Sequence, residues 1–144
     1  MRLCQGWCKT GALALLCMLM SVFIAPPGGT AAVGSFDVIV ADLNSKDWET
    51  RLAAVEKLGT VEDPRRVDVL LNVADTYQEY WPVKIKAMLL LGETGDPRAI
   101  EVLLAVYNDP FLNNLCPSIK SHAAIALGGF NDDSRVVSAL ITGI

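Results

Sequence analysis

The chain has 144 residues, of which 52% are hydrophobic and 19% charged, a composition that suits one folded domain and excludes a disordered, highly charged chain. Beyond residue 32 it keeps 10 basic residues against 16 acidic ones, a net charge of −6. An acidic chain without a cluster of Lys or Arg is a poor candidate for binding nucleic acid or an anionic membrane surface.

Residues 1–32 have the order of a secretory signal peptide. Arg2 and Lys9 give a positive start, residues 11–25 form an uncharged apolar run, and 30–32 offer small residues for cleavage. The run is shorter than the roughly 20 apolar residues of a membrane-spanning helix. We therefore expect export to the periplasm or the extracellular space, with an uncleaved membrane anchor as the alternative.

The positions of the four cysteines are consistent with export. Cys4, Cys8 and Cys17 lie in the leader, so the domain at 33–144 keeps only Cys116 and cannot form an internal disulfide. We expect Cys116 to be buried as a small apolar residue.

The domain opens with a short amphipathic segment. Phe36, Ile39, Val40 and Leu43 follow the i, i+3, i+4, i+7 spacing of a helix with one apolar face. The pattern predicts a helix over 35–44 that caps the N-terminal end of the remaining domain.

A phrase then occurs three times, at Leu58–Arg65, at Leu91–Arg98 and, less well kept, at Leu127–Arg135. Its glycines at 59, 92 and 128 are 33 and 36 residues apart. A period of about 20–50 residues is typical of a stack of repeats. The phrase predicts repeats at 46–79, 80–116 and 117–144.

Each repeat contains the signals of two helices. A first helix ends at Leu-Gly, and we expect Gly59 and Gly92 to lie just past a helix end with positive φ. Asp63-Pro64 then starts a second helix, because Asp caps free amide groups and Pro fits the first turn. The expected core faces of the second helices are Val67, Leu70, Leu71 and Ala74 in the first repeat, and Ile100, Leu103, Leu104 and Tyr107 in the second.

This pattern resembles the HEAT-like repeats named after the phycobilisome lyases, over residues 46–144. The resemblance implies an all-α fold, a short right-handed α-solenoid of about three helical pairs with an N-terminal capping helix. It also implies that the second helices line the concave surface. The third repeat departs from the family where Asp133-Ser134 replaces Pro-Arg, and its last helix is expected to be short.

The sequence contains no catalytic, cofactor-binding or metal-binding motif: no zinc-type spacing, phosphate loop or nucleophile elbow. The only histidine, His122, falls at a position where a surface residue is expected. Relatives with a di-iron centre resemble one another in His-Glu pairs, which this chain lacks. For a lyase-like reaction only Cys116, Tyr77 and Asp75 could be proposed.

The recurring Asp and Arg residues of the repeated phrase favour an architectural role. A capping Asp followed by Arg can link adjacent turns once in each repeat, and no ligand is needed for that. We assign Asp63, Arg65, Asp96 and Arg98 to this role.

Two features exceed what a repeat needs. The outward side of the second helices carries an apolar ridge of Val69, Val73, Val102 and Val106, flanked by Arg66, which is a binding surface if curvature does not bury it. The loops at 76–82 and 108–117 are long and aromatic. Trp81 and Phe111 are interpreted as hydrophobic staples and Tyr80 as a contact residue. The predicted partner-binding residues are Arg66, Val69, Val73, Val102, Val106 and Tyr80.

The favoured function is an exported, non-enzymatic adaptor that binds a protein or peptide on its concave face, without a cofactor. The alternatives are a lyase-like or tetrapyrrole-binding protein, and a structural module of a larger assembly.

Overall fold

The computed structural model describes residues 31–143, with side chains from Phe36 to Gly143, and in this part it is helical throughout, without strands. The predicted signal peptide lies outside the described residues except for Ala31 and Ala32, which begin the first helix. None of the described helices is both long and apolar enough to cross a membrane. The elements are α1 (Ala31–Asp42), α2 (Trp48–Leu58), α3 (Arg66–Asp75), α4 (Trp81–Thr94), α5 (Arg98–Asn108), α6 (Pro110–Leu115), α7 (Pro117–Leu127), the 3-10 turn η1 (Gly128–Phe130) and α8 (Ser134–Thr142).

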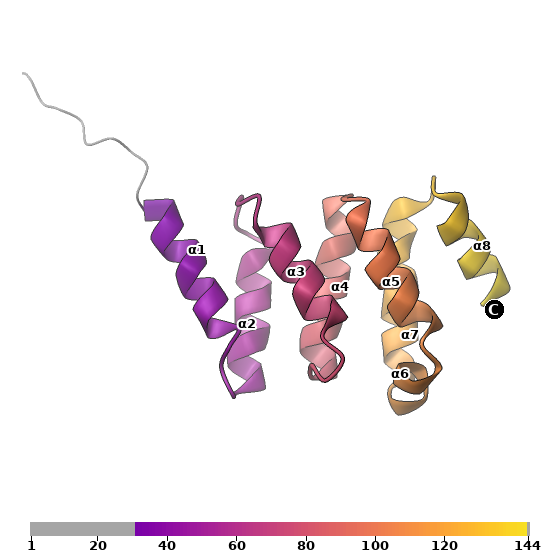
Figure 1. Cartoon of the computed structure of the whole chain (residues 1–144), viewed down its shortest axis with the longest axis horizontal. Coiled ribbons are helices and arrows are strands. Elements are labelled where there is room, and N and C mark those ends of the chain that lie inside the picture. Colours follow the sequence, from indigo (N-terminus) through magenta and orange to yellow (C-terminus); the bar gives the residue numbers. More distant parts are fainter. Residues whose placement is uncertain (1–30, 144) are drawn as a thin grey trace, which may run out of the picture. The chain divides into compact units, whose positions relative to one another are not determined.

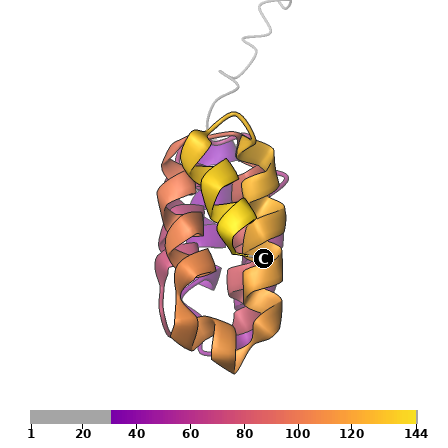
Figure 2. The same cartoon turned by 90° about the vertical axis from the view of Figure 1, so that its right-hand side faces the viewer.

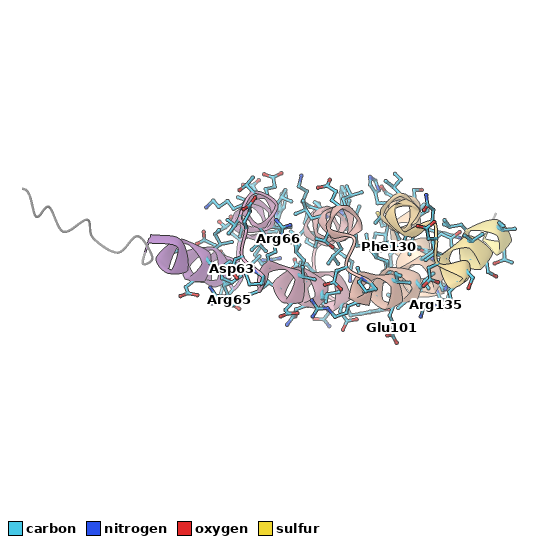
Figure 3. The ribbon with its side chains drawn as sticks, turned by 90° about the horizontal axis from the view of Figure 1, so that it is seen from above. Asp63, Arg65, Arg66, Glu101, Phe130 and Arg135 are labelled. Carbon is cyan, nitrogen blue, oxygen red and sulfur yellow. The ribbon has the colours of Figure 1, made fainter. Side chains whose placement is uncertain are left out.

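The helices stand in two rows (Figures 1 and 3). The first helices of the repeats, α2, α4 and α7, form one row, and the second helices, α3, α5 and α8, continue the row that α1 begins. Figure 2 looks along this stack from its C-terminal end. The arrangement confirms an all-α solenoid of helical pairs with an additional helix in front.

Element boundaries differ from the sequence expectation at the first helix, in the segment 108–117 and at the end of α4. Helix α1 begins at Ala31, four residues before the predicted start at 35. The expected loop at 108–117 contains helix α6, because Asp109 accepts hydrogen bonds from the amides of Phe111 (2.8 Å) and Leu112 (3.0 Å) and caps it. The last helix, α8, has only nine residues, as expected.

The core is a continuous apolar layer between the two rows. Most of the expected core positions are buried, and Val67, Leu71 and Leu104 are half-buried at its margin. The residues that have no exposed surface at all are Ala54, Val55, Leu58, Ala74, Val83, Ala87, Met88, Leu91, Ala99, Leu103, Ala123, Leu127 and Val136.

The expectation of positive φ at Gly59 and Gly92 is wrong. Gly59 follows α2 with a right-handed φ of −65°, and Gly92 lies inside α4. The helix continues to Thr94, and it is Gly95 that ends it, with φ of 67°.

The glycines of the repeated phrase are needed for close packing instead. A Cβ at Gly59 would lie 2.8 Å from Cδ2 of Leu90 in the next repeat. A Cβ at Gly92 would lie 2.7 Å from the carbonyl oxygen of Ala126 and 2.9 Å from its Cα. Leu90 and Ala126 are each two residues before the glycine of their own repeat. The same contact therefore recurs from one repeat to the next, and at Gly92 it is a contact with backbone, which cannot move aside.

Gly92 and Gly128 differ in the space that is available for a side chain. We expect Gly92→Ala to destabilise the fold by about 1–3 kcal/mol, because the methyl group overlaps the α7 backbone. Gly128→Ala has open space around it and right-handed φ of −58°, so it should be neutral or stabilising by up to about 1 kcal/mol. Urea unfolding of both variants checks this. Equal stability of the two would contradict the close approach of α4 and α7.

The edge that carries the Asp-Pro-Arg turns is tied together by ion pairs, and Figure 3 looks onto it. Within one turn, Asp96 bonds Arg98 at 2.8 Å, and Arg98 also reaches Asp68 of the preceding repeat at 2.6 Å. Arg65 repeats this arrangement with Asp63 (2.8 Å) and Asp37 (3.3 Å). The Asp–Arg bonds predicted for these residues are present, and each arginine also links its turn to the preceding helix of the same row. The capping role was predicted wrongly, because Asp63 and Asp96, which lie before the N-cap residues of α3 and α5, accept the amides of Arg65 and Arg98.

A second series of cations sits in the first helices, at the equivalent positions 51, 84 and 120. Arg51 donates to the carbonyls of Ser45 (2.9 Å) and Lys46 (3.2 Å), just past α1. The Lys84 ammonium donates to the carbonyl of Ala74 in the last turn of α3. Cations are favourable at the C-terminal end of a helix, where carbonyls lack amide partners. Lys120 lies 5.0 Å from the ring of Tyr107 in α5 and donates to a carbonyl at the end of α8.

The turn that contains Asp133 and Arg135 leads to a prediction about how the stability of the fold depends on pH. Hydrogen bonds from Arg135 lower the pKa of Asp133 from 3.8 to about 2. Because the folded pKa lies below the unfolded one, the ionised carboxylate stabilises the fold above about pH 4, and this contribution disappears as the pH falls to about 2. Asp133→Asn retains a capping side chain but loses the charge. Its urea midpoint should be lower than the wild-type midpoint at pH 7, and the two should converge near pH 2. A difference that stays constant with pH would contradict the assignment.

Candidate functional site

The largest hollow described in this structure is a cavity of about 480 Å³ at the edge opposite the Asp-Pro-Arg turns. The segment between α3 and α4 forms one side, and α6 and the start of α7 form the other. The lining residues are Tyr77, Gln78, Glu79, Tyr80, Trp81, Phe111, Leu112, Leu115, Cys116 and Ile119.

Large apolar side chains are exposed around this cavity. Leu115 is 68% exposed, Phe111 55% and Tyr77 52%, and Trp81 and Tyr80 are exposed to a similar degree. Together with Trp48, these residues form what we call the aromatic edge. Its floor is different, because Leu112 and Ile119 are buried.

The aromatic rings form two contacting groups. Tyr80 lies between Trp48 and Trp81, with ring centroids 4.9 Å and 5.7 Å away. Tyr77 stacks on Phe111 across the cavity mouth at 5.9 Å. These contacts join segments from two neighbouring repeats, so the rings hold one another in place while they remain exposed.

An ion pair fixes the segment that carries Tyr77 and Tyr80. Arg51 binds Glu79 with two nitrogens, Nη2 at 2.7 Å and Nε at 3.1 Å. Glu79 also accepts the amide of Tyr80 at 2.7 Å. The Glu79 side chain is only 11% exposed. A bidentate, half-buried pair is among the stronger ionic contacts in proteins, so it positions this segment firmly.

One carboxylate, Glu79, lines the cavity, and the charges of Asp75 and Asp109 act on the nearby Lys84. Lys84 is 1% exposed, and burial lowers its pKa below the ordinary value although Asp75, Glu79 and Asp109 act in the opposite direction. Burial raises the pKa of the Tyr77 hydroxyl, and the charge of Asp109 adds to that rise. The local electrostatics are thus those of carboxylates beside aromatic rings.

Of the predicted partner-binding residues, Tyr80 belongs to this cavity. Val69 and Val73 lie elsewhere, in a groove of about 310 Å³ between α1 and α3. Both valines are half-buried against the core. The groove also has a polar wall, which includes Asn72 and Thr76.

The predicted ridge is not one exposed surface. Val106 is 5% exposed and belongs to the core, and Val102 is half-buried. The expectation failed because neighbouring second helices pack on each other and cover the flanks that a lone helix would expose. Their role in partner binding stays a prediction.

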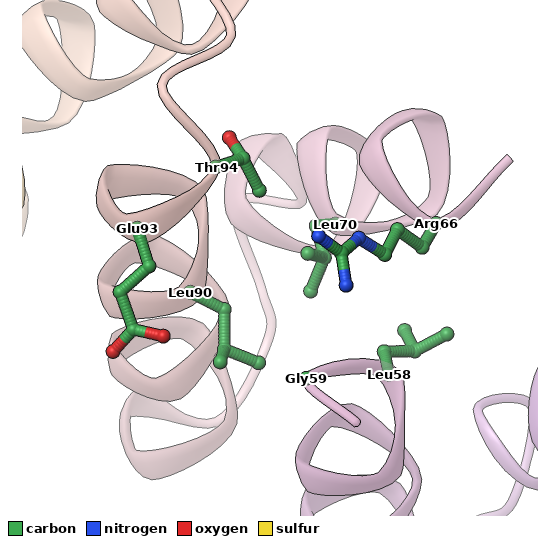
Figure 4. Close-up of a pocket in the computed structure, with 7 residues that line it drawn as sticks. All are labelled: Leu58, Gly59, Arg66, Leu70, Leu90, Glu93 and Thr94. Atoms are coloured by element: carbon green, nitrogen blue, oxygen red, sulfur yellow. The ribbon is translucent and has the colours of Figure 1, made fainter. Parts of the chain in front are cut away.

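Arg66 does not flank the valines either. Its side chain enters a separate small pocket of about 140 Å³ between α3 and the ends of α2 and α4, where its guanidinium lies near Leu70 (Figure 4). There it donates to the carbonyl of Val61 at 3.0 Å. The positions equivalent to Arg66 in the next repeats, Ala99 and Val136, are buried aliphatic residues.

The structure also places the other residues singled out in the sequence. Trp81 is the first residue of α4 and Phe111 lies inside α6, so neither is the buried staple that was expected. Cys116 is half-buried and lines the cavity. His122 is half-buried and bonded to the carbonyl of Ser118 at 2.7 Å.

Sequence reasoning missed Trp48 and Leu115 as members of the aromatic edge. Trp48 begins α2, and the residues around it have the pattern of an ordinary helix. Leu115 lies in a segment that the sequence predicted to be a loop. The sequence did contain one signal for these two residues. Each begins or ends a helix, and both helix ends lie at the same edge of the stack as Tyr80. Only the stacking of repeats brings them together.

Comparison with protein families gives one match. Residues 36–114 fit the family described as HEAT repeats, which is more than half of the chain. The search of curated proteins found no match.

The Arg51–Glu79 pair leads to a stability prediction. We expect Arg51→Met to cost about 2 kcal/mol of unfolding free energy, because it leaves a shielded carboxylate and two carbonyls without their donor. Lys57→Met is the matched control, since its pair with Asp42 is exposed and 3.5 Å long, and it should cost less than about 0.5 kcal/mol.

Urea unfolding measures both variants. Tryptophan fluorescence should also change in Arg51→Met, because Trp48 and Trp81 contact Tyr80. Equal effects of the two variants would contradict the anchoring role of Arg51.

Proposed function

This chain belongs to the HEAT-repeat family, and we propose that it is an exported, non-enzymatic scaffold that binds a protein or peptide at the aromatic edge. HEAT repeats commonly serve as scaffolds for protein interactions. The observation that carries the proposal is the exposure of Tyr77, Tyr80, Trp81, Phe111 and Leu115 around one cavity.

Exposed aromatic clusters are costly for a protein in water and are typical of interaction sites. Tyr and Trp are also the residues that most often dominate binding energy. A cavity with a buried apolar floor can receive a side chain of the partner, and the surrounding rings can exclude water from it. The anchoring of this segment by Arg51 supports binding by a surface that is already formed.

The second-helix surface is the competing location. Val69 and Val73 line the groove between α1 and α3, which supports a peptide-binding role there. The aromatic edge is favoured because its side chains are more exposed and its hollow is larger and more apolar.

Export is part of the proposal and rests on the sequence of residues 1–32 alone. Arg2, Lys9 and the uncharged run at 11–25 have the order of a signal peptide. A membrane anchor formed by the same segment is the alternative.

Two other functions stay as alternatives. For tetrapyrrole binding or lyase chemistry, Tyr77 and Cys116 line the same cavity, while Asp75 is not among the lining residues. For a module of a larger assembly, Val137 and Ile141 of α8 are exposed.

The proposal can be tested by selecting binders from a random peptide library. Their binding is then measured to two variants of the chain whose substituted residues are equally exposed. Leu115 at the aromatic edge is 68% exposed, and Ile141 on α8 is 69% exposed. Peptides selected on the wild-type chain should bind Leu115→Asp at least about tenfold more weakly, since a charge enters the apolar rim. They should bind Ile141→Asp as they bind the wild type.

A third variant separates the two surfaces. Asn72 is exposed and lines the groove with Val69 and Val73. If Asn72→Lys abolishes binding of the selected peptides and Leu115→Asp does not, the second-helix surface is the site and the aromatic edge is not. Unfolding curves confirm that all three variants remain folded.

A further inference from the structure

We propose that the occupant of the cavity is a peptide segment in which an apolar side chain is accompanied by Lys or Arg. This inference rests on the proposed function and adds the chemistry of the partner. It is based on the distribution of charge between the two edges of the stack, together with the form of the cavity.

The fold separates charges because each helical pair is antiparallel. The turns from a first to a second helix all lie at one edge, and the connections from a second helix to the next repeat lie at the other (Figure 1). Arg65, Arg98 and Arg135 are all at the first of these edges, where each pairs with a carboxylate of its own turn.

The two connections beside the cavity contain acidic residues and no basic ones. Residues 75–82 and 108–118 contain Asp75, Glu79 and Asp109, and no Lys, Arg or His. Lys46, next to Asp47 in the connection from α1 to α2, is exposed, whereas Arg51, Lys84 and Lys120 of the first helices are engaged within the fold. Arg51 is held by Glu79 and by backbone carbonyls, and the ammonium of Lys84 is buried and bonded to a carbonyl.

The net charge that faces solvent at this edge is negative, because Asp47 offsets Lys46 and leaves Asp75 and Asp109 unmatched. Asp75 is exposed at the end of α3, and it forms no ion pair within 4 Å among the described side chains. Asp109 is half-buried, and its oxygen accepts only amide hydrogen bonds, so its charge is not neutralised.

The lining of the cavity determines which side chains of the bound peptide fit there. Its floor is apolar, through Leu112 and Ile119, so an aliphatic or aromatic side chain fits there. The side chains of Tyr77 and Phe111 are more than half exposed beside it, and an exposed aromatic ring attracts Lys and Arg. In the described part of the chain, the cations placed over rings are Arg65 on Phe36 and Lys120 on Tyr107, and none of these four residues lines the cavity. The rings of the aromatic edge are thus open to a cation from a partner.

Synthetic peptides test the inference on the purified chain by calorimetry. The first has a Leu-Phe-Leu centre with two lysines on each side, the second has glutamates in place of the lysines, and the third has the lysines around a Ser-Gly-Ser centre. We expect the first to bind about tenfold or more tightly than either of the others, and its affinity to fall as salt is added.

Charge-neutral variants with preserved structure complete the test. Asn caps a helix as well as Asp does, so Asp109→Asn keeps α6 capped. Asp75→Asn removes an unfavourable charge from a helix C-terminus. The double variant should bind the lysine peptide about fivefold more weakly and leave the glutamate peptide unweakened. Glu62→Gln, exposed at the opposite edge, is the control and should change neither affinity.

The outcomes separate this inference from the proposed function. Equal binding of the lysine and glutamate peptides, or no effect of the double variant, overturns the inference about charge. The proposed function then still stands if library-selected peptides depend on Leu115. If the wild type binds none of the synthetic peptides, or the selected peptides contain no excess of Lys and Arg, the inference is also overturned. Selected peptides that ignore Leu115 overturn both.

Discussion

The spacing of the repeats depends on one contact, the approach of Gly92 in α4 to the backbone at Ala126 in α7. There is no room for even a methyl group between these helices. A Cβ at Gly129 would likewise lie 2.5 Å from the carbonyl oxygen of Gly92. Because backbone meets backbone, the distance between the two repeats is set by atoms that cannot change rotamer.

The close contact has consequences for the rest of the stack. First helices that meet at their glycine ends place the following turns side by side, within reach of the Arg98 guanidinium, which joins Asp96 and Asp68. At the opposite end, the cations at positions 51 and 84 meet the carbonyls that end the preceding second helices. Exposed ion pairs contribute little to stability individually. Their position in successive repeats indicates that they fix the register between units, while the apolar layer supplies most of the free energy.

The sequence predicted the fold well because its main signals are local. The Leu-Gly and Asp-Pro signals set the number and order of helices, and each repeat confirms the others. The role of Gly92 was predicted wrongly, since glycine at a helix end and glycine at a helix crossing look alike in one sequence. Only the position of the next repeat separates the two cases.

The candidate site was predicted less well for a related reason. Tyr80 was identified from an aromatic-rich loop, which is a local feature. Exposure of Val106 was inferred from a single helix, although the neighbouring helix decides it. Trp48 and Phe111 are 63 residues apart in sequence, and nothing local indicates that both rings belong to the same edge. Surfaces formed between repeats depend on the stacking geometry, which the periodicity indicates but does not measure.

The two edges of the stack solve the same problem of connection in different ways, and the difference supports a functional role for the aromatic edge. At the Asp-Pro-Arg edge, residues 95–97 are enough to join α4 to α5, with polar groups toward solvent. At the other edge, α5 is joined to α7 through a further helix that leaves Phe111 and Leu115 exposed. A short polar turn would satisfy the fold and avoid an exposed apolar surface, which favours aggregation. The longer connection is also held firmly, by the cap at Asp109 and the stacking of Tyr77 on Phe111. An exposed apolar surface that is rigidly supported favours the proposed contact with a partner.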